Sequence, residues 1–426
     1  MHRLTTSYQH AFFDKSDTTN CNLVSDTLIH HLGMDCGFIL ITTDKEATLL
    51  PLSPSKNCLF CSEVEIDVFP HILKLIANES LPNIVSNLPL LLAQHNIKSR
   101  NEDLLSMLWT NLDIDGDAGQ AQLVCFGRNP TCSVTAKDFQ LFESLGQYIT
   151  RVLHVKLLKL ERKQKKVSAI QTIIEKKLFE IHFQPIVDIN SGEPLYYEAL
   201  ARFSAHPIAS PDKWLSQANS LGLGIELEQA LIEETLRSLD KLSKHGLSIN
   251  VSINMSAQFI ESGRLCDLLN PRTKQKITIE LTEHTPSSNY QELFHQLTQL
   301  SAQGLDIAVD DAGSGYAGLH QILVLKPDII KLDRALIEAI NEDEMKQILV
   351  SSLLGFAHQT GTSIVAEGVE TLQEFDTLKR LGVQVFQGYL FSKPMRGNDV
   401  FQFHKDLTQV SKLFMREVEM EQRLAI

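Results

Sequence analysis

From residue 181 onward, the sequence alternates between short apolar runs and amphipathic helical stretches, and this alternation limits the fold more than any other feature of the chain. Eight runs are typical of strands, and helical stretches such as 225–246 and 291–304 lie between most of them. An eightfold βα alternation predicts an α/β fold, a parallel sheet closed into a TIM-like (β/α)8 barrel. The strand candidates are 181–189, 195–203, 248–254, 276–281, 306–311, 328–333, 362–369 and 383–390.

Polar side chains stand where these strands end. They are Glu198, Asn254, Glu280, Asp310 with Asp311, Lys331, Glu367 and Gln387. From Asn254 onward, neighbours in this set are 20 to 36 residues apart, which is about one strand–turn–helix unit. Each residue therefore returns to the carboxyl-terminal rim of the barrel, where such folds carry their chemistry. A single strand-end carboxylate is more often a solvated group, but a succession of them indicates a site.

Asp310 and Asp311 pose the sharpest question, because two adjacent carboxylates repel each other and are costly to bury without a partner. A solvated turn at the strand end is the simple explanation, and a bound divalent cation is the alternative. The set offers hard oxygen atoms without thiolate or imidazole, which favours Mg²⁺, Mn²⁺ or Ca²⁺ over zinc or copper. Two such ions are a recurring device for cleaving phosphodiesters, and Lys331 would then lie near the attacking water or the phosphate.

Eight motifs in order resemble the EAL domain, the family of cyclic di-GMP phosphodiesterases. The motif "YYEALARF" contains the signature Glu198–Ala199–Leu200. The others are "FQPIVDI", "INMSAQF", "ITIELTE", "VDDAGSGYAGL", "PDIIKLDRALI", "IVAEGVET" and "QGYLFSKPM". The resemblance implies an EAL domain over 175–410, with one antiparallel strand in the barrel, usually the first. It also implies hydrolysis of cyclic di-GMP to linear pGpG with two Mg²⁺ or Mn²⁺ ions.

The resemblance also implies a role for each matching residue. The first metal would be bound by Glu198, Asn254, Glu280 and Asp310. The second metal or its water would be surrounded by Asp310, Asp311 and Glu367. Lys331 would hold the hydrolytic water and Glu367 is the candidate general base, although a metal-bound hydroxide would need no protein base. Asp311 is also predicted to be a catalytic residue, together with Lys331 and Glu367.

Further positions concern the substrate and the loop after the paired aspartates. Gln184 and Arg202 would contact the nucleotide, Arg202 through its guanidinium fork on phosphate. Gln387 would lie near the metal-bound waters. Glu283 and Glu370 would brace the loop after Asp311 and the surroundings of the metal site.

One position departs from the family pattern, and it bears on activity. The family usually has Phe after the second aspartate, where this chain has Ala312, so the loop is expected to be looser. The alternative to an enzyme is a non-catalytic cyclic di-GMP receptor or protein-interaction module, which usually lacks part of the metal-binding ring. All ring residues are present here, which favours the enzyme, and no "GGDEF"-like segment supports a synthase.

The N-terminal part predicts a separate sensory domain. Helix 21–34, strand 36–44, a polar helix-and-loop middle, strand 118–128 and a long helix over 142–178 resemble a GAF-type domain of α+β class, whose ligand stays open. Thr135 is a candidate N-cap before that long helix. The predicted domains are 1–154, GAF-like; 155–174, helical linker; 175–410, EAL; and 411–426, helical tail.

The long helix also suggests how the chain assembles. Apolar residues recur along one face at Leu145, Ile149, Leu153, Leu157 and Leu160. An exposed apolar stripe usually finds a partner, so a homodimer is expected, unless the stripe packs on its own sensory domain. A net charge of -13 argues against nucleic-acid polymers and anionic membranes as partners. Seven cysteines without a dense pairing pattern favour the cytoplasm.

Overall fold

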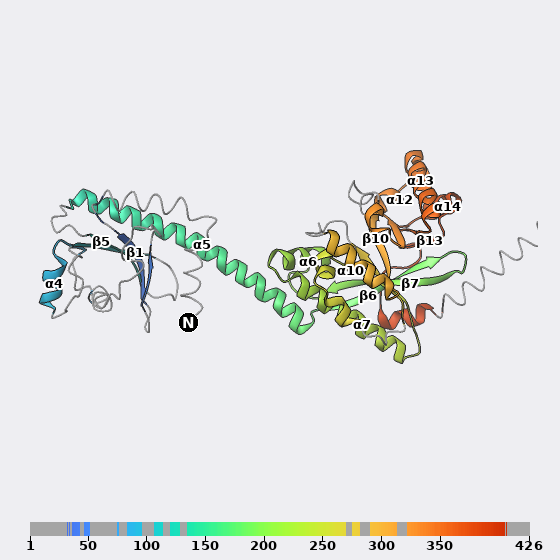
Figure 1. Cartoon of the computed structure of the whole chain (residues 1–426), viewed down its shortest axis with the longest axis horizontal. Coiled ribbons are helices and arrows are strands. Elements are labelled where there is room, and N and C mark those ends of the chain that lie inside the picture. Colours follow the sequence, from blue (N-terminus) through green and yellow to red (C-terminus); the bar gives the residue numbers. More distant parts are fainter. Residues whose placement is uncertain are drawn as a thin grey trace, which may run out of the picture. The chain divides into compact units, whose positions relative to one another are not determined.

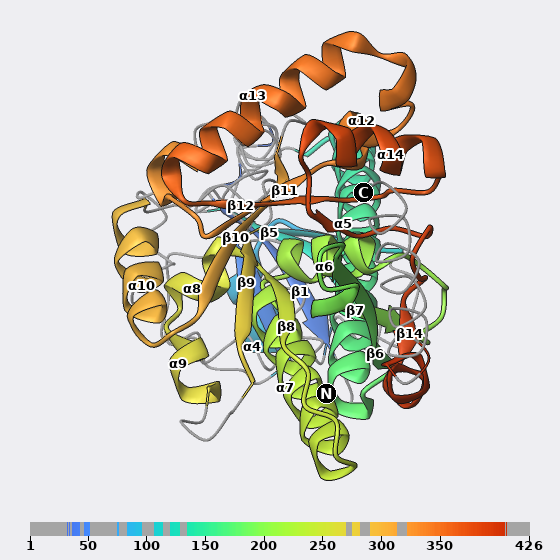
Figure 2. The same ribbon diagram turned by 90° about the vertical axis from the view of Figure 1, so that its right-hand side faces the viewer.

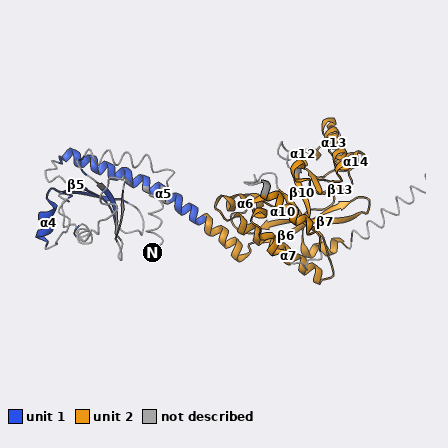
Figure 3. Cartoon of the chain, in the orientation of Figure 1, with its two compact units in different colours: residues 1–165 blue, residues 166–426 orange. Residues whose placement is uncertain are grey.

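The computed structural model divides the chain into two compact units, Met1–Lys165 and Lys166–Ile426 (Figure 3). No helix in the described part of the chain is long and apolar enough to cross a membrane. The predicted helix over 21–34 and the predicted tail over 411–426 lie outside the described residues. The structure describes residues 32, 34, 36–42, 47–51, 75, 83–95, 106–113, 120–127, 134–269, 275–281, 290–312, 322–404 and 406.

The N-terminal unit contains an antiparallel sheet with the strand order β2-β1-β5-β4-β3. Its strands are β1 (Cys36–Thr42), β2 (Ala47–Pro51), β3 (Ile84–Val85), β4 (Ser106–Leu112) and β5 (Gln120–Gly127), and the short helix α4 (Leu88–Gln94) follows β3. Strands β1 and β5 confirm the two predicted strands. The prediction of a helix-and-loop middle is wrong for β2, β3 and β4. Strand β4 is almost wholly buried, so it has no alternation of polar and apolar residues that the sequence could have revealed.

Helix α5 (Ala136–Lys176) follows this sheet and begins where Thr135 predicts (Figure 1). The Thr135 hydroxyl accepts a hydrogen bond from the Asp138 amide at 3.2 Å, which confirms the N-cap. Leu145 and Ile149 are buried in the core of the N-terminal sheet, so the first part of the apolar stripe packs on its own domain. Further along α5, Val155 and Leu158 are exposed.

The C-terminal unit is a closed barrel of eight strands (Figure 2). The strand β6 pairs antiparallel with both β7 and β13, and the other neighbours pair in parallel. This confirms the predicted barrel with its first strand reversed. The strands are β6 (Phe179–Asp188), β7 (Glu193–Phe203), β8 (Val251–Met255), β9 (Ile277–Leu281), β10 (Asp306–Ala312), β11 (Ile329–Leu332), β12 (Ser363–Ala366) and β13 (Val385–Phe386), and β14 (Met395–Arg396) adds to β6.

Successive strand residues face opposite sides of the barrel wall, and this alternation positions the site. On β8, Val251 and Ile253 pack outward in a core that includes Ile232 and Leu239 of the helix α7 (Gly224–Lys244), whereas Asn254 faces the interior. The helices are α6 (Pro211–Ser220), α7 (Gly224–Lys244), α8 (Ala257–Glu261), α9 (Arg264–Leu268), α10 (Tyr290–Ala302), α12 (Arg334–Ile337), α13 (Glu344–Thr360) and α14 (Leu372–Leu381), with the 3-10 helix η1 (Ile340–Glu342).

Candidate active site

Lys331, on β11, lies at the centre of the strand-end side chains. Its side chain is 1% exposed, and its Nζ contacts carboxylates from four other strand ends. The distances are 2.9 Å to Glu280 Oε2, 3.4 Å to Asp310 Oδ1 and 3.7 Å to Glu198 Oε2, and Glu367 also contacts the ammonium. We call these five residues the carboxylate ring. The structure thus brings together side chains that the sequence spreads from residue 198 to residue 367.

Glu198 connects the carboxylate ring to the neutral amides predicted beside it. Asn254 donates its side-chain amide to Glu198 Oε1 at 2.8 Å, and Gln387 donates to Glu198 Oε2 at 2.6 Å. The same Gln387 amide lies 3.2 Å from Gln184 Oε1, and Gln184 donates to the Ser392 carbonyl. Both predicted glutamines are therefore at the site, and β6 and β13 contribute to it although they pair antiparallel.

The carboxylate ring contains more negative charge than its single lysine neutralises. Burial alone would lower the pKa of Lys331, but Glu198, Glu280 and Glu367 raise it well above its ordinary value, so the ammonium stays charged. Burial raises the pKa of Glu280 to about 8, in spite of Lys331. Burial also raises the pKa of Glu367. Burial opposes ionisation of Glu198 as well, but there Lys331 and the two amides prevail and its pKa is lowered.

Strand β10 is irregular where its two aspartates occur. Val309 pairs with Ile330 and Ala312 pairs with Leu332, so Asp310 and Asp311 together face one residue of β11, in the manner of a β-bulge. The bulge ends the regular alternation at the point where Asp310 reaches Lys331. The side chains of Asp311 and Ala312, residue Glu283 and the loop 313–321 lie outside the described part of the structure.

Two other predicted residues, Arg202 and Glu370, lie around the carboxylate ring. Arg202 is four residues beyond Glu198 on β7, and its guanidinium donates to the Ala201 carbonyl at 2.8 Å. It is therefore on the inward face of β7 but bonded to its own backbone. Glu370 pairs with Arg334 at 3.1 Å on the rim. Gly388, which follows Gln387, admits the backbone of Val369 so closely that a Cβ would be 2.0 Å from the Val369 carbonyl oxygen.

Glu228, a buried carboxylate on α7, was not predicted from the sequence. Its Oε2 accepts a hydrogen bond from the Ser256 amide at 2.9 Å, and Ser256 caps α8 two residues after Asn254. Burial raises the pKa of Glu228. Glu228 therefore fixes the turn that follows a predicted ligand. The only available signal was an acidic residue on the apolar face of a helix, between Leu227 and Ile232.

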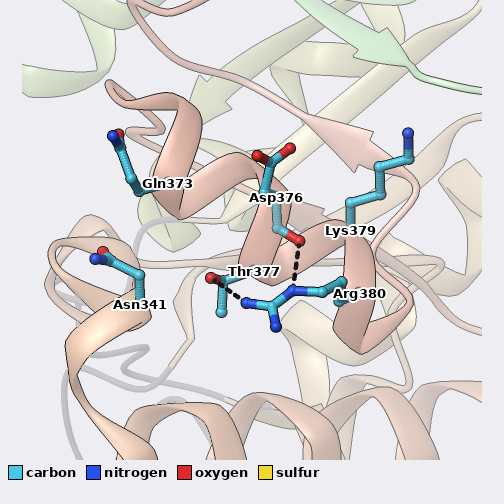
Figure 4. A pocket seen from close by; sticks show the side chains of 6 residues that line it. All are labelled: Asn341, Gln373, Asp376, Thr377, Lys379 and Arg380. Atoms are coloured by element: carbon cyan, nitrogen blue, oxygen red, sulfur yellow. Dashed lines mark hydrogen bonds between the residues drawn. The ribbon is translucent and has the colours of Figure 1, made fainter.

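A separate surface cavity of about 720 Å³ lies beside η1 and α14 (Figure 4). Arg380 lines it and is already tied to α14, because it donates to the Asp376 carbonyl and to the Thr377 hydroxyl. None of the lining residues belongs to the carboxylate ring, so this cavity is not the predicted site. They are Asn341, Gln373, Asp376, Thr377, Lys379 and Arg380.

The carboxylate ring fits a hard divalent cation by its donor chemistry. Among the described residues, no three acidic, histidine or cysteine side chains already form a metal cage, and the Lys331 ammonium lies among the carboxylates. However, Glu280 Oε1 is buried and has no hydrogen-bond partner in the described part of the chain. Four carboxylates also face one ammonium, so an added cation would offset charge that burial makes costly.

Taken together, the fold and the site define a TIM-like barrel with a buried carboxylate ring at the ends of its strands. The profile of the EAL domain family matches residues 167–394, which is more than half of the chain. The chain therefore belongs to the EAL domain family.

Two curated relatives match the same part of the chain. The cyclic di-GMP phosphodiesterase PdeL of Escherichia coli K12 is 33% identical over 242 residues, covering 54% of this chain and 66% of that protein. The bifunctional diguanylate cyclase/cyclic di-GMP phosphodiesterase MucR of Pseudomonas aeruginosa is 29% identical over 235 residues, covering 53% and 34%. The chain thus spans less than two thirds of the length of either relative.

Two solved structures are similar as well. The MucR phosphodiesterase in complex with cyclic di-GMP has a TM-score of 0.50 at 28% identity, covering 55% of this chain and 99% of that one. The EAL enzyme Bd1971 in its cGMP-bound form has a TM-score of 0.51 at 22% identity, covering 87% of this chain and 93% of that one. The second likeness concerns the fold alone.

Proposed function

We propose that this chain hydrolyses cyclic di-GMP to linear pGpG with a water molecule activated by bound divalent cations. The observation that carries the proposal is the carboxylate ring, in which Lys331 contacts Glu198, Glu280, Asp310 and Glu367. The names of PdeL and MucR, and the nucleotide in the MucR complex, support the substrate. The proposed compartment is the cytoplasm.

Glu198, Asn254, Glu280 and Asp310 are the proposed ligands of one cation, and Asp310, Asp311 and Glu367 are those of a second. Mg²⁺ or Mn²⁺ bound there would lower the pKa of a water and offset the negative charge that develops on the phosphate oxygens. Residues of the chain would move the proton and position the water. Glu367, whose raised pKa a bound cation would lower, would accept the proton of the attacking water where a protein base is needed, and the Lys331 ammonium would hold that water.

The side-chain amides of Gln184, on β6, and Gln387, directly after β13, would orient the substrate. Gln184 and Gln387 already form a bonded pair beside Glu198, so their positions are fixed before the nucleotide arrives. Arg202 would exchange its bond to the Ala201 carbonyl for a phosphate oxygen. Glu283 and Glu370 are proposed to brace the loop 313–321.

A purified-protein assay tests this proposal directly. The full chain is incubated with cyclic di-GMP and Mg²⁺, Mn²⁺ or Ca²⁺, and pGpG is measured by chromatography. We expect turnover with Mg²⁺ and Mn²⁺ and inhibition by Ca²⁺, whose larger radius and looser geometry position water poorly. Nucleotide binding at saturating Mn²⁺ without any pGpG would contradict the enzyme and leave the non-catalytic receptor.

For the N-terminal unit we propose a GAF-like sensory role with an unknown small-molecule or protein signal. The five-stranded antiparallel sheet with α5 packed on it supports this reading. The proposed boundaries stay at 1–154, 155–174 and 175–410.

We also propose a homodimer in which the α5 helices of two chains lie side by side. Because Leu145 and Ile149 are buried in their own sheet, the seam would lie further along and on another face of α5, at Val155 (52% exposed) and Leu158 (39% exposed), which are not part of the predicted stripe. Sedimentation at micromolar concentration tests this proposal. We expect a dimer that Leu158→Glu converts to monomer, whereas Leu195→Glu, at a similarly exposed leucine on β7, does not. A monomeric wild-type chain would contradict it.

A further inference from the structure

At the carboxylate ring and below it, the inward faces of three neighbouring strands carry three buried polar atoms that have no hydrogen-bond partner among the described residues. They are the hydroxyls of Tyr196 and Ser252 and the Oε1 atom of Glu280. Their strands are adjacent, because Glu198 pairs in register with Ser252 on β8, and β8 pairs with β9. Nearly all buried polar groups in proteins are satisfied, so three such atoms on neighbouring strands require an explanation.

Tyr196 lies inside the barrel, under the site. It is two residues before Glu198 on β7, and the strand alternation places both on the inward face. Its side chain packs in a cluster with Ile186, Ile329 and Val365. Burial and then the charge of Glu280 raise the pKa of Tyr196, so its hydroxyl remains a hydrogen-bond donor.

The two oxygens of Glu280 have different surroundings. Oε2 accepts a hydrogen bond from Lys331 at 2.9 Å, whereas Oε1 has no donor in the described part of the chain. A carboxylate held at one oxygen only can rotate, and it would have to give up that contact in order to bind a cation. A second hydrogen-bond donor, to Oε1, would keep the Glu280 carboxylate in its orientation while Oε2 exchanges Lys331 for the cation.

We propose that Tyr196 is a positioning residue whose hydroxyl donates a hydrogen bond to Oε1 of Glu280, directly or through one water molecule that Ser252 also binds. The contact keeps Oε2 directed at the carboxylate ring. Its consequence for cation binding rests on the proposed function, but the contact itself does not.

Tyr196→Phe removes only the hydroxyl and keeps the ring that fills the barrel. Loss of such an outer contact costs about tenfold or more in metal affinity, because the ligand is no longer held in its binding orientation. Tyr197→Phe is the matched control. The Tyr197 hydroxyl is also buried without a partner among the described residues, but this side chain faces the outer core between strands and helices.

The first measurement is Mn²⁺ binding to the full, nucleotide-free chain by electron paramagnetic resonance, together with kcat for cyclic di-GMP. We expect Tyr196→Phe to weaken Mn²⁺ binding about tenfold and to lower kcat, and Tyr197→Phe to change neither. Wild-type Mn²⁺ affinity in Tyr196→Phe would overturn the proposal, and so would an equal loss in both variants.

A second measurement separates this inference from the proposed function. In metal-free protein, the thermal unfolding of Tyr196→Phe, Glu280→Ala and the double variant forms a double-mutant cycle. We expect the two shifts in Tm to be non-additive, because the hydroxyl loses its acceptor in Glu280→Ala. Additive shifts would overturn the contact even if cyclic di-GMP is hydrolysed. If the wild type neither binds Mn²⁺ nor forms pGpG, the proposed function is overturned instead. The double-mutant cycle would still show whether Tyr196 contacts Glu280.

Discussion

The barrel interior and the N-terminal sheet bury different kinds of side chain. In the described part of the N-terminal unit, the buried polar residues are all neutral: Ser106, Thr110 and Gln122. The barrel unit buries ionisable groups: Glu198, Glu228, Glu280, Lys331 and Glu374. Burying charge costs several kcal/mol unless it is paired, so folding alone does not favour it. The barrel therefore carries a cost in stability that the proposed chemistry would explain, whereas the sheet packs against α5.

The largest expected effect comes from removing a carboxylate from the barrel. Glu198→Ala and Asp310→Ala should each lower kcat for pGpG formation about a thousandfold, or about 4 kcal/mol, because each removes a proposed cation ligand. Glu193→Ala is the control, since Glu193 begins the same strand as Glu198 but is exposed at its other end. Retention of most activity in either ligand variant would show that the charged interior is not the catalytic centre.

Lys331→Ala should have the next largest effect, in kcat more than in nucleotide binding. A group that acts on the attacking water contributes mainly in the transition state, so we expect a loss of about a hundredfold in kcat with much of the affinity kept. Steady-state kinetics measure the loss in kcat. Equilibrium binding of the nucleotide in the presence of Ca²⁺ measures the affinity. Lost binding with wild-type turnover of the remaining complex would instead identify Lys331 as a substrate clamp.

The strand-end spacing predicted which residues meet in the barrel but not how they pair. Which carboxylates the Lys331 ammonium contacts depends on the stagger of neighbouring strands, which the sequence does not show. The bulge at Asp310 was also hidden, since "AVDDA" is compatible with a regular strand. In the N-terminal unit, β4 was missed because both of its faces are buried. Periodicity thus locates half-exposed or strongly patterned elements and misses fully buried ones.

The pH dependence of stability should differ between the two units. The folded pKa of Glu280 is about 8 and the unfolded value is 4.5, so this group binds more protons when folded. Its contribution is fully present below pH 4.5 and is lost as the pH rises through 8. Without metal, the unfolding free energy of the barrel should therefore fall between pH 5 and pH 8, by up to about 1.4 kcal/mol per pH unit.

Each unit contains one of the two tryptophans, which makes this prediction measurable in the full chain. Trp109→Phe leaves Trp214 to report on the barrel, and Trp214→Phe leaves Trp109 to report on the sheet. Urea unfolding in EDTA at several pH values should show the decline only for Trp214, and Glu280→Gln should reduce it, leaving the part that the raised pKa of Glu367 contributes. The same decline at both tryptophans would mean that the buried charges do not cause it.

The smallest expected effect tests the proposal that the N-terminal unit influences the barrel through α5. Inserting two residues beside Lys163 turns one end of the helix by about 200° relative to the other, whereas seven inserted residues return it to within about 20°. Neither insertion changes the carboxylate ring, so the effects should be small. We expect a severalfold change in kcat from the two-residue insertion and little change from the seven-residue insertion. Turnover of cyclic di-GMP with Mn²⁺ measures both. Equal activity in all three chains would make α5 a passive tether, and the apolar sheet would then have no influence on the charged barrel through that helix.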